Sequence, residues 1–263
     1  MPDPLDDLSP DRLTLDRLTA DLSVFQRRKG HRFSSDDVIT AWAALQVCPS
    51  PVRVLDLGCG LGSVLLHLAW SLPDATLEGV EVQDVSFELL RRNVAHNTAH
   101  ERLGERVTIH HGDFRDPAVM AAVRGPFDLV TGTPPYFPPG TASQADDEQR
   151  TRARVETRGG IEAYVTTGAS LLAPGGWLVV CGDADAELRL HAVAASTGLD
   201  VAATFVVIPR AGRPPLFTVW AMRAEPHGAA HHRRTLTLRD EHGERTADAR
   251  MMRAFSGFPE KVA

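Results

Sequence analysis

The sequence predicts an α/β protein built on an open, mostly parallel, seven-stranded sheet, with helices on both faces and an antiparallel strand at the C-terminal end. The first observation is that, from Val52 onward, short apolar runs alternate with stretches of helical period, the pattern of a parallel sheet. The second is that the last two apolar runs, 201–208 and 215–223, are joined only by the short loop PRAGRP, so we expect them to pair antiparallel.

The elements follow in order along the chain. Strands are predicted over 52–58, 76–82, 107–113, 127–132, 177–183, 201–208 and 215–223. The first of these is a short apolar run that ends in glycines, as a buried parallel strand should. Helices are predicted over 38–47, with Ser34 or Ser35 as the N-cap, and over 62–72, 85–97, 161–172 and 186–197, from their helical period and start and stop signals.

The domain organisation is that of one main unit with an extension at each end. With 263 residues, 43% of them apolar, the chain can bury a sizeable core. Residues 1–24 are expected to be a polar lead-in, partly disordered or weakly helical, and residues 25–223 the main domain. Residues 224–263 are rich in His and Arg and low in apolar residues before the segment MMRAFSGF, so we expect a basic appendage packed on the same domain.

Composition argues against several classes of protein. The net charge of −6 gives no general attraction to nucleic acid, so any polyanion contact needs a local basic patch. The three cysteines (Cys48, Cys59 and Cys181) form no CxxC pair, and no carboxylate or cysteine completes a metal site at His231-His232. We therefore expect no metal. The polar N-terminus does not resemble a signal peptide, and the apolar runs are only strand-length, so a cytoplasmic protein without a membrane span is expected.

A glycine-rich turn, Asp56-Leu57-Gly58-Cys59-Gly60-Leu61-Gly62, follows the first predicted strand and opens a helix. Glycines allow the backbone to approach a bulky ligand, and the helix offers its N-terminal N–H groups. Glu81 lies at the end of the next strand, where a carboxylate can accept hydrogen bonds from both ribose hydroxyls. This arrangement predicts a nucleotide site, and both NAD-type and S-adenosylmethionine-type sites use it.

The exact form of the turn resembles the first motif of S-adenosylmethionine-dependent methyltransferases. NAD-type sites usually show GxGxxG, but here the sixth position is Ser63, and Asp56 begins a D-x-G-x-G pattern. His111-Gly112-Asp113-Phe114 resembles that family's adenine-binding turn. The resemblance implies a Rossmann-like doubly wound fold and S-adenosyl-L-methionine as cofactor. The cofactor-binding residues it implies are Asp56, Gly58, Cys59, Gly60, Glu81, Val82, Asp113, Phe114 and Thr133.

A proline motif ends the fourth predicted strand, where Thr133-Pro134-Pro135-Tyr136 resembles the (N/D/S)-P-P-(Y/F/W) motif of amino-group methyltransferases. In that family the first side chain and the next backbone carbonyl accept hydrogen bonds from the target NH₂, and the aromatic residue stacks on the base. The resemblance implies these catalytic roles for the four residues. Thr133 departs from the usual asparagine, and a hydroxyl both donates and accepts. The alternative is a rigid turn with Tyr136 buried. Asp128 is expected to be structural.

Flanking segments resemble the bacterial tRNA adenine-N6 methyltransferases of valine tRNA. Residues 25–36 match "Q-x-x-x-G-x-R-F-S-x-D", residues 153–156 match "A-R-x-E", and residues 236–246 match the family's ending with Arg245 where an aromatic is usual. The resemblance implies N6-methylation of an adenine in tRNA. A target base must leave its stack to be reached, which a single-stranded loop permits.

Basic residues near these segments are candidates for contacting RNA phosphates, namely Arg28, Lys29, Arg32 and Arg154. The alternative is that they pair with some of the 34 acidic residues on the surface. Two other functions also stay open at this point. One is N-methylation of a protein side chain or a small molecule, and the other is a catalytically weakened cofactor-binding scaffold. The sequence does not predict an oligomeric state.

Overall fold

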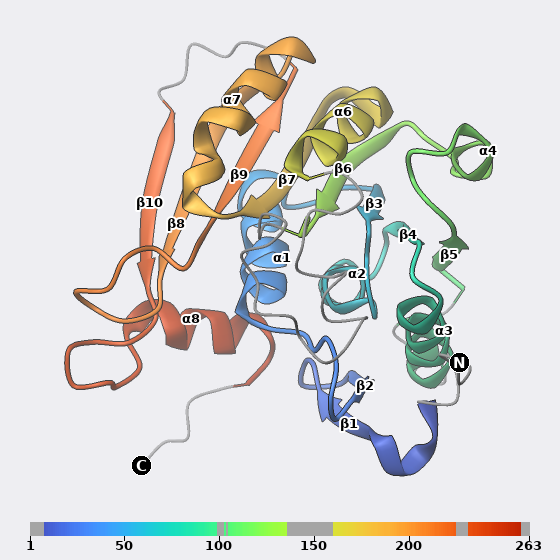
Figure 1. Cartoon of the computed structure of the whole chain (residues 1–263), viewed down its shortest axis with the longest axis horizontal. Coiled ribbons are helices and arrows are strands. Elements are labelled where there is room, and N and C mark those ends of the chain that lie inside the picture. The colour runs from blue at the N-terminus through green and yellow to red at the C-terminus, as the bar shows by residue number, and fades with distance from the viewer. Residues whose placement is uncertain (1–7, 99–102, 104, 136–159, 225–230, 259–263) are drawn as a thin grey trace.

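A computed structural model describes residues 8–98, 103, 105–135, 160–224 and 231–258 (Figure 1). The strands are β1 (Leu13–Arg17), β2 (Ser23–Arg27), β3 (Arg53–Leu57), β4 (Thr76–Glu81), β5 (Val107–His111), β6 (Phe127–Gly132), β7 (Leu172–Gly182), β8 (Asp200–Ile208), β9 (Phe217–Arg223) and β10 (His232–Thr237). The α-helices are α1 (Ser35–Val47), α2 (Ser63–Ser71), α3 (Asp84–Thr98), α4 (Pro117–Met120), α6 (Ile161–Leu171), α7 (Glu187–Ser196) and α8 (Ala247–Phe255), with short 3₁₀ turns at Pro10–Arg12 and Ala184–Ala186.

The main sheet has eight strands in the order β10-β8-β9-β7-β6-β3-β4-β5. Neighbours are parallel except around β9, which runs antiparallel to both β7 and β8. The predicted fold class is confirmed, including the antiparallel pair at the end. The eighth strand, β10, was not predicted from its sequence HRRTLT, and it pairs in parallel with β8 at the edge of the sheet. Only Leu236 of this strand is buried, so its sequence carries almost no apolar signal.

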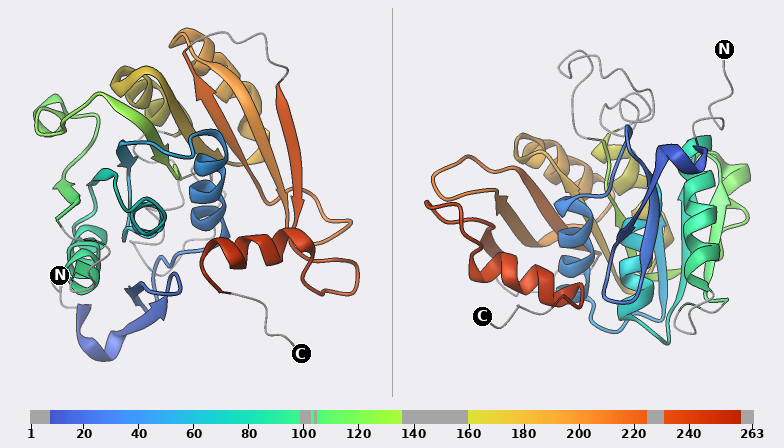
Figure 2. Two further views of the ribbon diagram at one scale, coloured as in Figure 1. Left: turned by 180° about the vertical axis from the view of Figure 1, so that it is seen from behind. Right: turned by 90° about the horizontal axis from the view of Figure 1, so that it is seen from below.

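Helices cover both faces of the sheet, as Figure 2 shows from behind and from below. Buried side chains of α1, α2, α3 and α8 belong to one apolar cluster on one face. Those of α6 and α7 belong to a second cluster on the other face. The arrangement is therefore the doubly wound one that alternating strands and helices predict.

The N-terminal segment differs from the expected disordered or weakly helical lead-in. Residues of β1 pair antiparallel with β2, from Leu13 opposite Arg27 to Arg17 opposite Ser23. Leu18 and Leu22, which the sequence analysis assigned to the lead-in, are buried. The hairpin thus packs on the main domain, and a boundary at residue 24 would cut through β2. Too few apolar residues alternate in this stretch for the strand period to be recognised.

Two asparagines of α3 hold the hairpin against the domain. Asn93 Oδ1 accepts from the Phe25 amide at 2.6 Å, and its Nδ2 donates to the Phe25 carbonyl at 3.2 Å and to the Leu61 carbonyl at 2.9 Å. Asn97 makes the corresponding pair of hydrogen bonds to Ser23. Because Leu61 belongs to the glycine turn, Asn93 connects that turn to the N-terminal hairpin.

The C-terminal segment contacts α2. Thr246 caps α8 by accepting a hydrogen bond from the Ala249 amide. At the end of this helix the hydroxyl of Ser256 lies 3.1 Å from His67 Nε2, and the Phe255 ring stacks on the His67 ring with centroids 5.8 Å apart. His67 belongs to α2, the helix that the glycine turn opens.

No helix in the described part of the chain is both long and apolar enough to cross a membrane.

Candidate functional site

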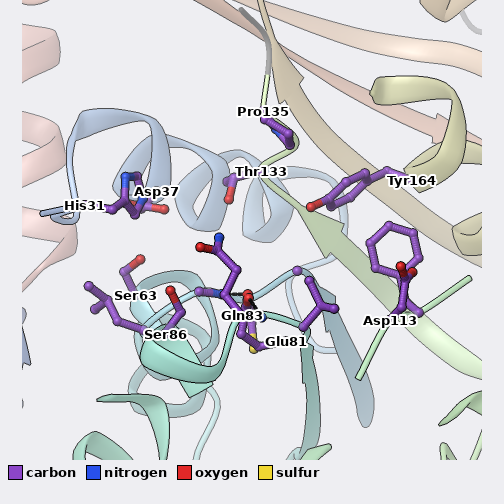
Figure 3. A pocket seen from close by; sticks show the side chains of 16 residues that line it. His31, Asp37, Ser63, Glu81, Gln83, Ser86, Asp113, Thr133, Pro135 and Tyr164 are labelled. Atoms are coloured by element: carbon purple, nitrogen blue, oxygen red, sulfur yellow. Dashed lines mark hydrogen bonds between the residues drawn. The ribbon is translucent and has the colours of Figure 1, made fainter. Parts of the chain in front are cut away.

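A pocket opens at the edge of the sheet where the parallel strands β3, β4 and β6 end, which is where open α/β sheets bind ligands. Figure 3 shows the side chains around it, with His31 and Asp37 on one side, Thr133 and Pro135 above, and Tyr164 opposite. The lining residues are His31, Asp37, Gly58, Cys59, Gly60, Leu61, Ser63, Glu81, Val82, Gln83, Ser86, Asp113, Phe114, Thr133, Pro135 and Tyr164.

The glycine turn forms one wall of the pocket because three of its residues adopt positive φ. The φ angles are 59° at Gly58, 57° at Gly60 and 93° at Gly62, a region that side chains other than glycine rarely occupy. A Cβ on Gly58 would also lie 2.1 Å from the hydroxyl of Tyr164, whereas a Cβ on Gly60 would meet nothing within 4 Å. Glycine is therefore required at position 58 for two reasons, the positive φ of the backbone and the close approach of the Tyr164 side chain.

Glu81 ends β4 beside this turn, as predicted. Its Oε2 accepts from the Gly60 amide at 2.8 Å and its Oε1 from the Gln83 amide at 2.6 Å. Burial raises the pKa of this carboxyl, and the backbone donors oppose that rise. Each carboxylate oxygen can accept more than one hydrogen bond, so Glu81 keeps acceptor capacity for ribose hydroxyls that enter the pocket.

Asp56 lies beneath the turn rather than in the described lining of the pocket. It is buried, and its Oδ1 accepts from the Thr131 hydroxyl at 2.8 Å. Burial raises the pKa of Asp56 to about 7, and Glu81 adds to this rise. The first acidic residue of the motif therefore connects β3 to β6 under the ligand site.

Asp113 and Phe114 follow β5 and line the side of the pocket next to Tyr164. The rings of Phe114 and Tyr164 meet edge to face, with centroids 4.7 Å apart. Asp113 forms an ion pair with Arg115 at 2.6 Å. A carboxylate beside an aromatic face suits the edge and the plane of an adenine, which are the roles that the resemblance implies for these two residues.

The proline motif reaches the pocket from the end of β6. Thr133 and Pro135 line it, and Pro134 lies between them in the chain. Tyr136 lies outside the described residues, so its stacking role stays a prediction. Asp128, at the opposite end of β6, accepts from the Val52 and Arg53 amides at 2.9 Å each, in agreement with the structural role expected for it.

Several residues that line the pocket were not predicted from the sequence as site residues. Tyr164 lies within a helix whose period gives no sign of a site. Asp37 is buried, and its Oδ2 accepts from the Ser34 amide at 2.9 Å. Burial, together with Asp36, raises the pKa of Asp37 well above its usual range. The family pattern pointed to Asp36, whereas the capping spacing from Ser34 to Asp37 was the signal that could have identified the buried residue.

None of the basic residues predicted to bind substrate lines the described pocket. Arg28 donates to the Asp11 carbonyl at 3.1 Å, and Arg32 forms an ion pair with Asp16 at 3.0 Å. Arg32 thus has its charge balanced within the N-terminal hairpin. Lys29 lies between them in the chain, and Arg154 falls outside the described residues. The part of the chain that the structure describes also contains no group of His, Cys, Asp and Glu side chains suited to a metal ion.

The acidic side chains around the pocket favour a cationic ligand, whose positive charge would oppose the rise in pKa that burial causes at Asp37 and Glu81. Asp37, Glu81 and Asp113 are among its described lining residues, and no lysine or arginine is. A dinucleotide would bring a pyrophosphate close to these carboxylates, where like charges repel. S-adenosylmethionine carries a sulfonium and an ammonium group, both positive, on a nucleoside whose base and ribose suit Phe114 and Glu81. The donor and acceptor set therefore fits this cofactor better than NAD.

Comparison with known proteins agrees with this geometry. Residues 54–147, which include the glycine turn, Glu81 and the proline motif, match the family model described as a methyltransferase domain. This part of the chain is therefore similar to methyltransferase domains. The overall fold is also similar to that of a predicted O-methyltransferase from Agrobacterium tumefaciens, with a TM-score of 0.58 and 18% sequence identity over 84% of this chain and 96% of that one.

Two groups of named relatives share this domain. A tRNA1(Val) (adenine(37)-N6)-methyltransferase of Porphyromonas gingivalis is 32% identical over 61% of this chain, and the match spans 63% of that relative's length. A release factor glutamine methyltransferase of Geobacter sulfurreducens is 34% identical over 55% of this chain and 50% of its own length. The predicted resemblance to tRNA adenine-N6 methyltransferases is confirmed as a similarity over this part of the chain.

Proposed function

We propose that the protein transfers the methyl group of S-adenosyl-L-methionine to the exocyclic amine of an adenine in tRNA. The observation that carries this proposal is the strand-end turn Thr133-Pro134-Pro135 at one wall of a pocket whose other walls hold the glycine turn and Glu81. The similarity to tRNA adenine-N6 methyltransferases supports the choice of substrate. We place the activity in the cytoplasm, where such tRNA substrates occur.

The bound cofactor would supply an activated methyl group on a positively charged sulfur. The residues of this chain would provide position rather than acid–base chemistry. Glu81 would hold the ribose, and Asp113 and Phe114 the adenine ring. Asp37, which hydrogen-bonds the amide of Ser34 at the start of α1, would balance the positive charge at the methionine end. Asp56 would keep β3 and β6 in register beneath the turn.

The target amine would be held by the proline motif. The Thr133 hydroxyl and the Pro134 carbonyl would accept its two hydrogens, which directs the nitrogen lone pair toward the methyl group. The amine nitrogen would accept the methyl group, the bound cofactor would supply the sulfur leaving group that keeps the bonding electron pair, and the nitrogen would then release one proton to solvent. Tyr136 would stack on the base.

A second candidate is N-methylation of a glutamine side chain in a protein, because release factor glutamine methyltransferases match the same domain. A carboxamide, like adenine, presents a planar NH₂ group to the two acceptors. A cofactor-binding scaffold without turnover is the third alternative, and the replacement of asparagine by Thr133 favours it.

Transfer of radiolabelled methyl to total tRNA, with release factor and a DNA oligomer as parallel acceptors, tests the proposal. Label recovered as N6-methyladenosine from tRNA would support it. Label in protein would select the glutamine reaction, and cofactor binding without transfer would select the scaffold. At saturating cofactor, Thr133→Val should lower kcat at least ~10-fold, since it removes one acceptor for the amine. An unchanged kcat would contradict the role of Thr133.

A further inference from the structure

Two loops carry arginines at the same edge of the sheet as the pocket. β8 and β7 both run antiparallel to β9, so β8 runs in the direction of β7, and β10 is parallel to β8. The carboxyl ends of β8 and β10 therefore lie at the same end of the sheet as the carboxyl ends of β3, β4 and β6, where the pocket opens. The loops that follow them, residues 209–216 and 238–246, leave the sheet there and lie beside α8 (Figure 1). We call these two segments the arginine loops.

Four exposed arginines project from the arginine loops, namely Arg210, Arg213, Arg239 and Arg245. Within the described residues none of them has a carboxylate at ion-pair distance. Other late arginines differ, because Arg233 pairs with Glu187 at 2.8 Å and Arg234 with Asp248 at 3.2 Å. The arginine loops thus carry positive charge that the described fold does not balance by direct pairing.

Neutral backbone groups hold the two loops and their guanidinium groups in place. The Ala211 amide donates to the Arg239 carbonyl at 2.8 Å, which joins one loop to the other. The Arg239 side chain donates to the Gly243 carbonyl at 2.7 Å, and the Arg210 guanidinium donates to the Glu241 carbonyl. A guanidinium held by a carbonyl keeps its full charge, so these contacts fix position without neutralisation.

Acidic residues also occur in the second loop. Asp240 uses one carboxylate oxygen to accept from the His242 and Glu244 amides, at 2.9 Å each, and so closes its own turn. Glu241 and Glu244 are exposed, but neither side chain forms an ion pair with the four arginines among the described residues. Together the loops carry four arginines against three carboxylates, a formal net charge of +1 with histidine neutral, on a chain whose overall charge is −6.

We propose that the arginine loops bind the RNA backbone on one side of the target nucleotide, so that the pocket selects the base and the loops position the strand. This inference rests on the proposed function. Strands in a sheet are about 4.8 Å apart, so β6 and β10 are separated by roughly 20 Å along the shared edge. The arginine loops therefore lie within reach of the RNA backbone a few nucleotides away from a base held in the pocket.

The surface differs from the one that the sequence predicted. Arg32 is ion-paired with Asp16. Arg28 donates to the Asp11 carbonyl and keeps its charge, but it lies by the N-terminal hairpin and not in the arginine loops. Arg245 stands where the family's ending has an aromatic residue, so a position that first looked like a departure from the family adds one of the charges of this surface.

The test compares R213Q/R245Q with wild type and with R124Q. Neither Arg213 nor Arg245 donates a side-chain hydrogen bond to a described residue, so their neutralisation removes charge and leaves the loop contacts intact. Arg124 is exposed and precedes β6, at the opposite end of the strands from the pocket, so R124Q serves as a control for the loss of a single surface charge elsewhere. Binding of unfractionated tRNA is measured at several salt concentrations, with S-adenosylmethionine affinity as the check on folding, and methyl transfer to the same tRNA is measured in parallel.

Each phosphate contact contributes roughly 0.7–0.9 to the slope of log K against log salt, which is about a 4- to 5-fold effect at 0.15 M. R213Q/R245Q should therefore bind tRNA about 15- to 30-fold more weakly, with a slope smaller by about 1.5 and an unchanged cofactor Kd, while R124Q stays within twofold of wild type. If the wild type methylates tRNA but R213Q/R245Q binds tRNA with the wild-type Kd and salt slope, the proposed surface is wrong and the proposed function is not affected. A wild type that neither binds nor methylates tRNA would overturn the proposed function as well.

Discussion

Replacing Gly58 by alanine should destabilise the protein much more than the same change at Gly60. The two residues have nearly equal φ angles, 59° and 57°, so both variants incur the cost of a left-handed alanine, about 1–2 kcal/mol. Only at Gly58 does the new Cβ collide, lying 2.1 Å from the Tyr164 hydroxyl and 3.0 Å from the ring carbon that carries it. Overpacking of this kind costs typically about 1–3 kcal/mol more.

The Tyr164 ring has little room to move away. It packs edge to face on Phe114, and a Cβ on Gly132 would lie 2.5 Å from the ring on another side. We therefore expect Gly58→Ala to lose about 2–5 kcal/mol in the free energy of unfolding and Gly60→Ala about 1–2 kcal/mol, both measured by urea titration without cofactor. Adding Tyr164→Phe removes the closest atom and should recover about 1 kcal/mol or more of the Gly58→Ala loss. Equal losses for the two alanine variants, or no coupling with Tyr164→Phe, would refute the reasoning.

Three further predictions concern buried polar groups around the turn. The pKa of Asp56 is about 7 in the folded protein against 3.8 ordinarily, so the folded state holds a proton that the unfolded chain has lost between about pH 4 and pH 7, and stability falls as pH rises through this window. Asp56→Asn should lack this pH dependence, which is at most about 1.4 kcal/mol per pH unit in the free energy of unfolding. Urea titrations between about pH 4 and pH 7 measure it. An identical pH slope in wild type and variant would contradict the prediction. Burial lowers the pKa of His67 from 6.5 to about 4, so its contribution to stability has the opposite sign. Stability is lost as the pH falls from about 6.5 to about 4, and His67→Gln should show no such loss. Asn93→Ala and Asn97→Ala should each lower the free energy of unfolding by about 2–3 kcal/mol. Only Asn93→Ala should also weaken cofactor binding, measured by calorimetry, because only Asn93 donates to the Leu61 carbonyl of the glycine turn. Equal cofactor affinities of the two variants would argue against that connection.

The sheet and the ligand edge could be predicted because their signals are local. Apolar runs that end in glycine, and an acidic residue at the end of the next strand, are written within a few residues of each other, and Gly58 and Glu81 lie where those signals put them. The same locality explains the placement of Thr133 and Pro135 at the pocket, since two prolines after a strand mark its end.

What the sequence could not show depends on contacts between distant segments. Tyr164 faces Gly58 across more than a hundred positions in the chain, and no periodicity in α6 marks that face. β10 is an edge strand with one buried side chain, so partners rather than composition determine its structure. The basic residues were predicted as one class, but the ion pair between Arg32 and Asp16 and the unpaired state of Arg213 and Arg245 among the described residues follow only from the fold.

The segments at the two ends of the chain have a common place in this fold. The N-terminal hairpin reaches the glycine turn through Asn93, whose amide contacts both Phe25 and Leu61. The C-terminal helix reaches the same region through Ser256 and His67, and the His67 Nδ1 lies 3.2 Å from the carbonyl of Ser63 at the first residue of α2. The turn is thus supported from both sides by segments that composition alone assigned to the periphery. Since a ligand site loses affinity when its supporting contacts loosen, removing either segment should weaken cofactor binding even though neither carries a residue of the glycine turn.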